Sequence, residues 1–66
     1  MRLLWKSLPG RKLRALSDTG QGIRDEDFDD VIEWLSERIP NVFRLEFNVW
    51  QFETDEQITM FLLVWQ

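Results

Sequence analysis

The 66-residue sequence contains no cysteine, no histidine and no tyrosine. Without cysteine the chain has no disulfide, and without cysteine or histidine it lacks the usual ligands of a structural zinc site. Ser7, Ser17 and Ser36 have no histidine to activate them as nucleophiles. The composition therefore argues against an enzyme and against a bound metal or other cofactor.

Long apolar runs are also absent. The longest, Met60 to Trp65, has six residues, far below the roughly 18–20 that a membrane-spanning helix needs. Near the start of the chain, Lys6 interrupts a short apolar stretch before the hydrophobic core of a signal peptide could form. These features predict one soluble, cytoplasmic domain that covers residues 1–66.

Charge is unevenly divided along the chain, whose net charge is −4. Residues 1–24 hold six arginines and lysines against Asp18 alone, which gives +5. Residues 25–66 hold Arg38 and Arg44 against eleven acidic residues, which gives −9. This division predicts a surface with one basic and one acidic side.

Residues 25–39 have the periodicity of one amphipathic helix. The apolar positions expected on its buried side are Phe28, Val31, Ile32, Leu35 and Ile39. Carboxylates follow the same spacing on the opposite side: Glu26, Asp29, Asp30, Glu33 and Glu37, with Asp27 flanking them. Asp25 is the expected N-cap, and Pro40 is expected to end the helix.

The segment before this helix predicts a strand followed by a turn. Residues 1–8 are the expected strand, and Pro9-Gly10 matches the central residues of a type II turn. Residues 11–17 are either the returning strand or a short helical turn, since type II turns suit tight hairpins poorly. A two-residue loop would place Leu4 opposite Ala15.

The segment after the helix predicts a second hairpin. The apolar residues of its first strand alternate with polar ones, as on a strand with one buried face: Phe43, Leu45, Phe47 and Val49. Residues 53–56 form the expected turn and residues 57–66 the expected second strand. With a four-residue loop, Val49 lies opposite Met60 and Phe47 opposite Leu62.

Together these elements predict an α+β fold in the order ββαββ. A small antiparallel or mixed sheet of three to four strands would be covered on one face by a single helix, an arrangement similar to a β-grasp domain in topology alone; βαββ is the alternative. The uncovered face would expose five apolar residues, which predicts a homodimer or partner interface. These residues are Trp50, Phe52, Phe61, Leu63 and Trp65.

Two weaker motifs predict other ligands. Asp25, Asp27 and Asp29 begin like a calcium-binding EF-hand loop, but Asp30 replaces its glycine and Ser36 its final glutamate, so no metal site is expected. Basic residues near the N-terminus offer nucleic-acid binding as an alternative function. They are Arg11, Lys12 and Arg14.

The acidic row is the main functional signal, because every neighbouring charge on it has the same sign. Like-charged pairs four positions apart cost roughly 0.2–0.5 kcal/mol each. The leading hypothesis is a non-enzymatic protein-binding module or small inhibitor that presents this row to a basic partner, in particular a nucleic-acid-handling protein. Antagonists of this kind, which act by nucleic-acid mimicry, are typical of phages and mobile elements.

Overall fold

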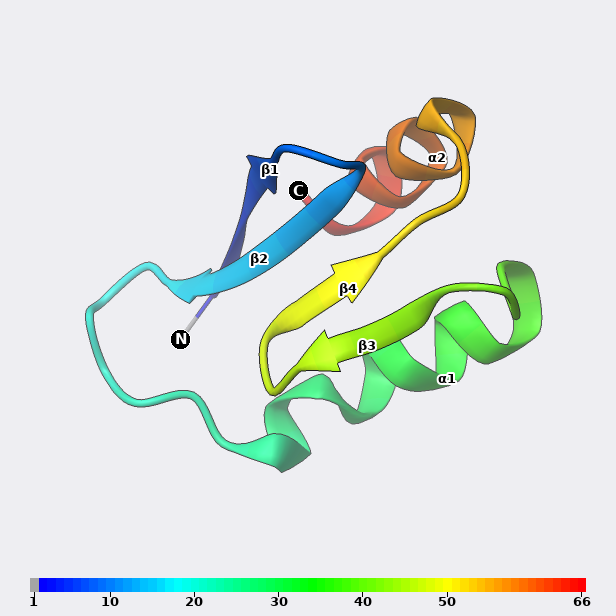
Figure 1. Ribbon diagram of the computed structural model, residues 1–66. Helices are drawn as coiled ribbons and strands as arrows, with labels where there is room; N and C mark the ends of the chain where they lie inside the picture. The colour runs from blue at the N-terminus through cyan, green and yellow to red at the C-terminus, as the bar shows by residue number, and fades with distance from the viewer. Residues whose placement is uncertain (1) are drawn as a thin grey trace.

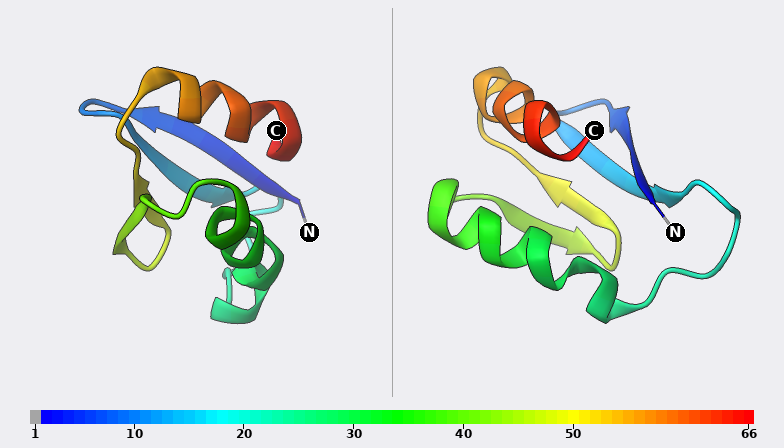
Figure 2. Two further views of the ribbon diagram at one scale, coloured as in Figure 1. Left: turned by 90° about the vertical axis from the view of Figure 1, so that its right-hand side faces the viewer. Right: turned by 180° about the vertical axis from the view of Figure 1, so that it is seen from behind.

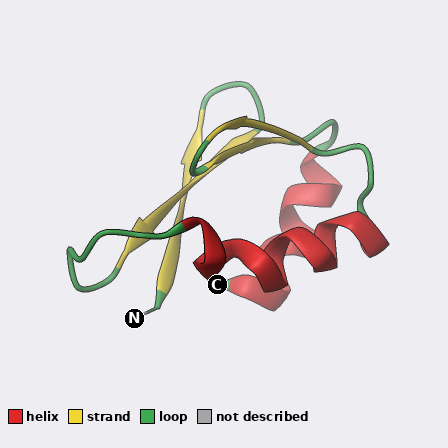
Figure 3. Ribbon diagram, turned by 90° about the horizontal axis from the view of Figure 1, so that it is seen from below, coloured by secondary structure: helices red, strands yellow, loops and turns green. Residues whose placement is uncertain are grey.

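Residues 2–66 are described by a computed structural model, in which a four-stranded antiparallel sheet carries two helices on one face (Figures 1 and 3). The strands lie in the order β1-β2-β4-β3. The α+β class is therefore confirmed. The element order is ββαββα with a short 3-10 helix before the first α-helix, and the predicted ββαββ order and β-grasp arrangement are not confirmed.

The first hairpin joins β1 (Leu3–Leu8) to β2 (Lys12–Ser17). The segment 11–17 is thus a strand and not a helical turn; Met1, included in the predicted first strand, lies outside the described residues. The loop has three residues, 9–11, because Leu8 pairs with Lys12, and within it Gly10 and Arg11 adopt positive φ angles of 84° and 59°. Leu4 therefore pairs with Leu16, one position away from the predicted register.

This register separates the two faces of the hairpin cleanly. Directly paired residues lie on the same face of an antiparallel sheet, so Trp5 and its partner Ala15 share the inner face. Both are buried there beside Leu13. The opposite face carries Lys6 paired with Arg14 and is left uncovered by the helices.

The second hairpin consists of β3 (Phe43–Glu46) and β4 (Val49–Gln51). Its turn falls at residues 47–48, within the segment predicted as one long strand. Phe43, Leu45 and Phe47 are therefore exposed, at 64%, 51% and 47%, and not buried as predicted. The inner position of β4 is taken by Trp50, which pairs with Leu13 of β2.

The central helix is confirmed, with a 3-10 first turn. Element η1 (Asp25–Phe28) leads directly into α1 (Asp29–Arg38). Arg24, rather than Asp25, is the N-cap residue, and its backbone N–H donates to Asp27 Oδ2 at 2.8 Å. Ile32, predicted to face inward, is 39% exposed.

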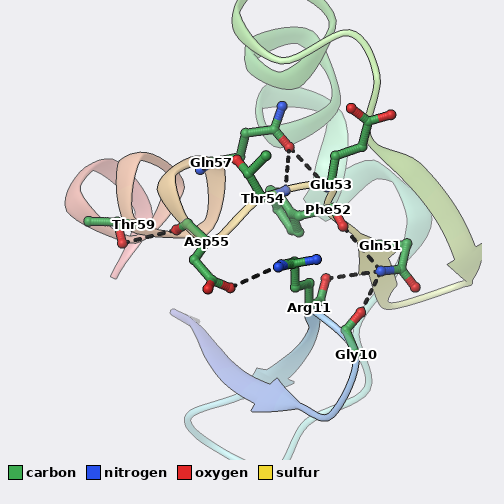
Figure 4. Close-up of polar contacts among 9 residues, drawn as sticks. All are labelled: Gly10, Arg11, Gln51, Phe52, Glu53, Thr54, Asp55, Gln57 and Thr59. Atoms are coloured by element: carbon green, nitrogen blue, oxygen red, sulfur yellow. Dashed lines mark hydrogen bonds and ion pairs between the residues drawn. The ribbon is translucent and has the colours of Figure 1, made fainter.

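The last segment is the helix α2 (Asp55–Trp65), not the predicted strand. Thr54 Oγ1 accepts a hydrogen bond from the backbone N–H of Gln57, and Gln57 Oε1 accepts from the backbone N–H groups of Thr54 and Glu53 (Figure 4). This reciprocal capping fixes the start of the helix. On a helix, Ile58, Phe61 and Trp65 fall on one side, where they pack against the core.

Aromatic rings fill the space between the sheet and the two helices. Phe61 of α2 contacts Trp5 of β1 edge-to-face at 4.8 Å between ring centroids. It also meets Trp34 of α1 at 5.8 Å, so one ring joins three elements. The two helices lie on the same side of the sheet (Figure 2), and the opposite side remains uncovered.

Candidate protein-binding surface

The carboxylates of η1 and α1 lie on the side of the helix opposite its buried residues. Phe28, Val31 and Leu35 are at most 6% exposed. The carboxylates half a helical turn away face solvent, and we call these exposed residues the acidic ridge: Glu26, Asp29, Asp30, Glu33 and Glu37. The residues of the predicted acidic row thus lie on one continuous surface, except for Asp27, which is half-buried and caps the 3-10 turn.

Few cations of the chain approach this ridge. Arg24 Nη1 lies 3.0 Å from Glu26 Oε1, and Arg44 Nη2 lies 2.8 Å from Asp25 Oδ1 at the base of the ridge. The other ion pairs among residues 2–66 join β2 and its loop to Glu46 and Asp55. Within this part of the chain, the four carboxylates Asp29, Asp30, Glu33 and Glu37 take part in no ion pair.

A groove of about 290 Å³ runs between α1 and the second hairpin. Its floor contains the buried side chains Leu35, Ile39 and Trp50. Ile32 and Ser36 line it on the helix side, whereas Pro40, Val42 and Arg44 line it at the end of the helix and on β3. The groove therefore offers an apolar surface directly next to the acidic ridge.

Strand β3 forms the outer edge of the sheet beside this groove. Every residue of Phe43–Glu46 is exposed, and β4 is its single neighbouring strand among the described residues. Arg44 is held over the groove by two hydrogen bonds to the Phe47 carbonyl oxygen, at 3.0 and 2.7 Å. The residues of this edge strand are thus accessible to solvent.

The apolar face predicted as a dimer or partner interface is not formed. Trp50, Phe52 and Phe61 are at most 3% exposed and belong to the core. The cause is the helical conformation of residues 55–65, which turns Phe61 inward and leaves Leu63 81% exposed. Trp65 packs partly against the core, so the five residues do not share one surface.

The uncovered face of the sheet carries three basic residues, of which Arg14 forms an ion pair with Glu46 at 3.5 Å. Lys6 and Arg14 are paired across β1 and β2, and Lys12 follows on the same face of β2. Exposed Leu4 and Leu16 lie beside them. Of the predicted basic cluster, Lys12 and Arg14 lie on this face, whereas Arg11 is in the loop and pairs with Asp55 at 3.2 Å. Basic and acidic surfaces are therefore separated by the thickness of the domain.

Two of the three carboxylates of the EF-hand-like segment are engaged in contacts within the protein, whereas Asp29 is exposed. Asp25 pairs with Arg44, and Asp27 accepts from the Arg24 backbone N–H. Across residues 2–66, no group of three or more acidic side chains is arranged to hold a metal ion. In the same part of the chain, no helix is long and apolar enough to cross a membrane.

Comparison of the chain with protein-family models, with curated proteins and with solved structures found no match. The functional argument therefore rests on the geometry of the surface itself.

Sequence reasoning missed the groove and the strand edge. The alternation of Phe43, Leu45 and Phe47 with polar residues predicts a buried face, but it is equally compatible with an exposed apolar edge. Ile32 and Ser36 carry no signal of their own, because a groove depends on how a helix and a strand are placed in three dimensions. Ile32 is 39% exposed at the groove, whereas Trp34 of the same helix contacts Phe61 of α2.

Proposed function

We propose that the chain is a non-enzymatic protein-binding module whose acidic ridge docks on a basic surface of a partner protein. The supporting observation is the run of exposed carboxylates that have no cationic partner among the described residues. Each like-charged pair four positions apart costs about 0.2–0.5 kcal/mol in the free chain. A cationic partner surface removes that repulsion and accelerates the encounter.

The partner class that fits best is a protein that handles nucleic acid, because such proteins carry basic surfaces that contact phosphates. A row of carboxylates along a helix offers that surface a substitute for phosphates. The sharper form of the proposal is therefore an inhibitor that covers the phosphate-binding surface of its target. Inhibitors of phage or mobile-element origin are the class to which this form belongs.

Charge reversal on the ridge tests the proposal. We would immobilise the chain, its Glu33→Lys variant and its Glu56→Lys variant, and quantify the proteins each captures from an extract of the source cells. Glu33 and Glu56 are both exposed helical glutamates, so the two variants change net charge equally. The expected result is a set of basic proteins captured by the wild type and by Glu56→Lys but lost with Glu33→Lys. Equal capture by all three chains contradicts the proposal.

Competition with nucleic acid tests the inhibitor form. If the ridge covers a phosphate-binding surface, a short DNA duplex should release the captured protein from the wild-type chain. A peptide of polyglutamate at the same charge concentration is the control for general anion competition. Release by duplex at concentrations at which polyglutamate has no effect supports the inhibitor; equal release by both contradicts it.

A second candidate function uses the uncovered sheet face. The directly paired Lys6 and Arg14, with Lys12 beside them, form a basic surface on the side of the domain opposite the ridge. We propose nucleic-acid binding there as the alternative. It predicts a salt-dependent affinity for labelled single-stranded DNA that Lys6→Glu lowers and Arg38→Glu, on α1, leaves unchanged. Equal effects of both variants contradict a specific role for this face.

A further inference from the structure

The open edge of β3 and the groove beside it form a site that the acidic ridge alone does not explain. An edge strand presents unpaired backbone N–H and C=O groups, to which an extended peptide can add as a new strand. Proteins commonly block such edges with inward-pointing charges, prolines or a covering segment. Here β3 carries one inward-pointing charge, Arg44, whose side chain is 30% exposed, and a register shift between Arg44 and Glu46. Phe43 and Leu45 nevertheless remain exposed, and the strand borders an apolar groove.

The side chains around the edge are suited to an extended apolar segment. On the outer side, Phe43 is 64% exposed and Leu45 51% exposed. On the groove side, Leu35, Ile39 and Trp50 form an apolar floor. A strand paired with β3 would direct alternate side chains to these two surfaces, because successive residues of a strand point to opposite faces.

The negative charges near the groove favour a positively charged ligand. Asp29 and Glu33 are exposed on α1, on either side in sequence of Ile32, which lines the groove. Arg44, the cation at the groove, is already paired with Asp25. Long basic side chains from a segment lying along β3 can therefore reach carboxylates that have no other cationic partner among residues 2–66.

We propose that the β3 edge and the α1–β3 groove bind an extended segment of a partner protein in which apolar residues alternate with lysine or arginine. This inference rests on the proposed function and specifies its binding mode: the segment joins the sheet as a fifth strand, and the acidic ridge receives its basic side chains. A second copy of the chain fits less well. Its own β3, Phe-Arg-Leu-Glu, would bring one glutamate for its one arginine and so no net positive charge.

A displayed library of random peptides about ten residues long, the upper range of natural strands, is the probe. Selection on the full chain should enrich sequences with apolar residues alternating with lysine or arginine. Synthetic versions with N-methyl groups on one alternate set of residues should lose about tenfold in affinity or more, because they lose backbone hydrogen bonds to β3. Methylation of the other set, whose N–H groups point away, should have little effect.

The matched protein variants are Ser36→Trp and Ser36→Ala. Ser36 is exposed and lines the groove, so a tryptophan there fills the groove without a change of charge, whereas alanine leaves it open. Ser36→Trp should weaken the selected peptides by about tenfold or more, by the steric exclusion of their apolar side chains. Circular dichroism and thermal melting of both variants show whether the fold is retained.

The outcomes separate this inference from the proposed function. If the peptides fail to bind Glu33→Lys but still bind Ser36→Trp, the acidic ridge is supported and the strand-addition site is overturned. The same conclusion follows if methylation of either set of residues weakens the peptides equally. A selection that does not enrich basic peptides also overturns the strand-addition site. A wild-type chain that is dimeric by light scattering and monomeric as Ser36→Trp shows that a second copy occupies the edge, which also overturns it. Peptides insensitive to both variants contradict the ridge and the groove together.

Discussion

Arg44 of β3 donates a hydrogen bond from Nη2 to Oδ1 of Asp25 at 2.8 Å, which ties the edge strand to the first turn of the helical segment. The same guanidinium donates to the Phe47 carbonyl oxygen from two nitrogens. Its central carbon lies 5.1 Å from the ring centroid of Trp50 and 5.4 Å from that of Phe28. One side chain thus holds the turn, the edge and the helix in a fixed relation.

Replacement of Arg44 by lysine should lower the free energy of unfolding by about 1–2 kcal/mol, because an ammonium cannot make the forked hydrogen bonds and cover the rings at once. Urea denaturation followed by tryptophan fluorescence measures the change. Arg24→Lys is the control, since its pair with Glu26 is largely exposed and is worth about 0–1 kcal/mol in total. Equal effects of the two substitutions would show that the contacts of Arg44 with Phe47 and the rings add nothing.

Phe61 and Leu63 distinguish the observed helix from the predicted strand. Two residues apart, they would share one face in a strand but point in nearly opposite directions on a helix. Phe61 is 1% exposed and contacts Trp5, whereas Leu63 is 81% exposed. Phe61→Ala should therefore cost about 3–5 kcal/mol, and Leu63→Ala less than about 0.5 kcal/mol, both by urea denaturation. Comparable losses would mean that residues 55–65 are not the helix described.

The misassignment of residues 57–66 has a definite physical origin. Ile58, Phe61, Leu62 and Trp65 fit a helical spacing, but an apolar run also pairs well with an alternating strand, and short runs do not separate the two. The decisive signal was Thr54 followed three positions later by Gln57, the signature of a capping box. The predicted fold assigns these two residues to different elements, Thr54 to the turn of residues 53–56 and Gln57 to the start of the strand.

The segment 25–39 was predictable because its period is unambiguous: Phe28, Val31, Leu35 and Ile39 recur at helical spacing, and all four are buried. The acidic ridge followed from the same period. The register of the first hairpin was not predictable, since it depends on Arg11 at a φ of 59°, a conformation that arginine seldom adopts. The groove could not be predicted from the sequence either, because it depends on how far α1 lies from the second hairpin.

The capping box at the start of α2 should contribute measurably to stability. Thr54 Oγ1 accepts from the Gln57 backbone N–H at 3.2 Å. Thr54→Ala should therefore lower the free energy of unfolding by about 0.5–2 kcal/mol and reduce the helical signal in circular dichroism. Thr54→Ser keeps the hydroxyl oxygen and should restore most of the loss. A serine variant as unstable as the alanine variant would rule out capping as the cause.

Glu33 occupies the centre of the acidic ridge, with Asp29 four positions before it and Glu37 four positions after it. Glu33→Lys replaces two repulsive pairs by two attractive ones, each change being worth about 0.4–1 kcal/mol, so the free energy of unfolding should rise by about 0.8–2 kcal/mol at low salt. At about 1 M NaCl, where the Debye length is near 3 Å, the gain should disappear. Glu56→Lys, in the first turn of α2, should instead lose a few tenths of a kcal/mol, roughly, because it opposes the helix dipole. Thermal melts across a salt series measure the stability of all three chains.

A stability gain of Glu33→Lys that persists at high salt would show that charge repulsion is not its source. A chain that becomes more stable and at the same time loses its captured partner would show that the carboxylates weaken the free fold and strengthen the bound one, since folding alone would favour lysine at this position.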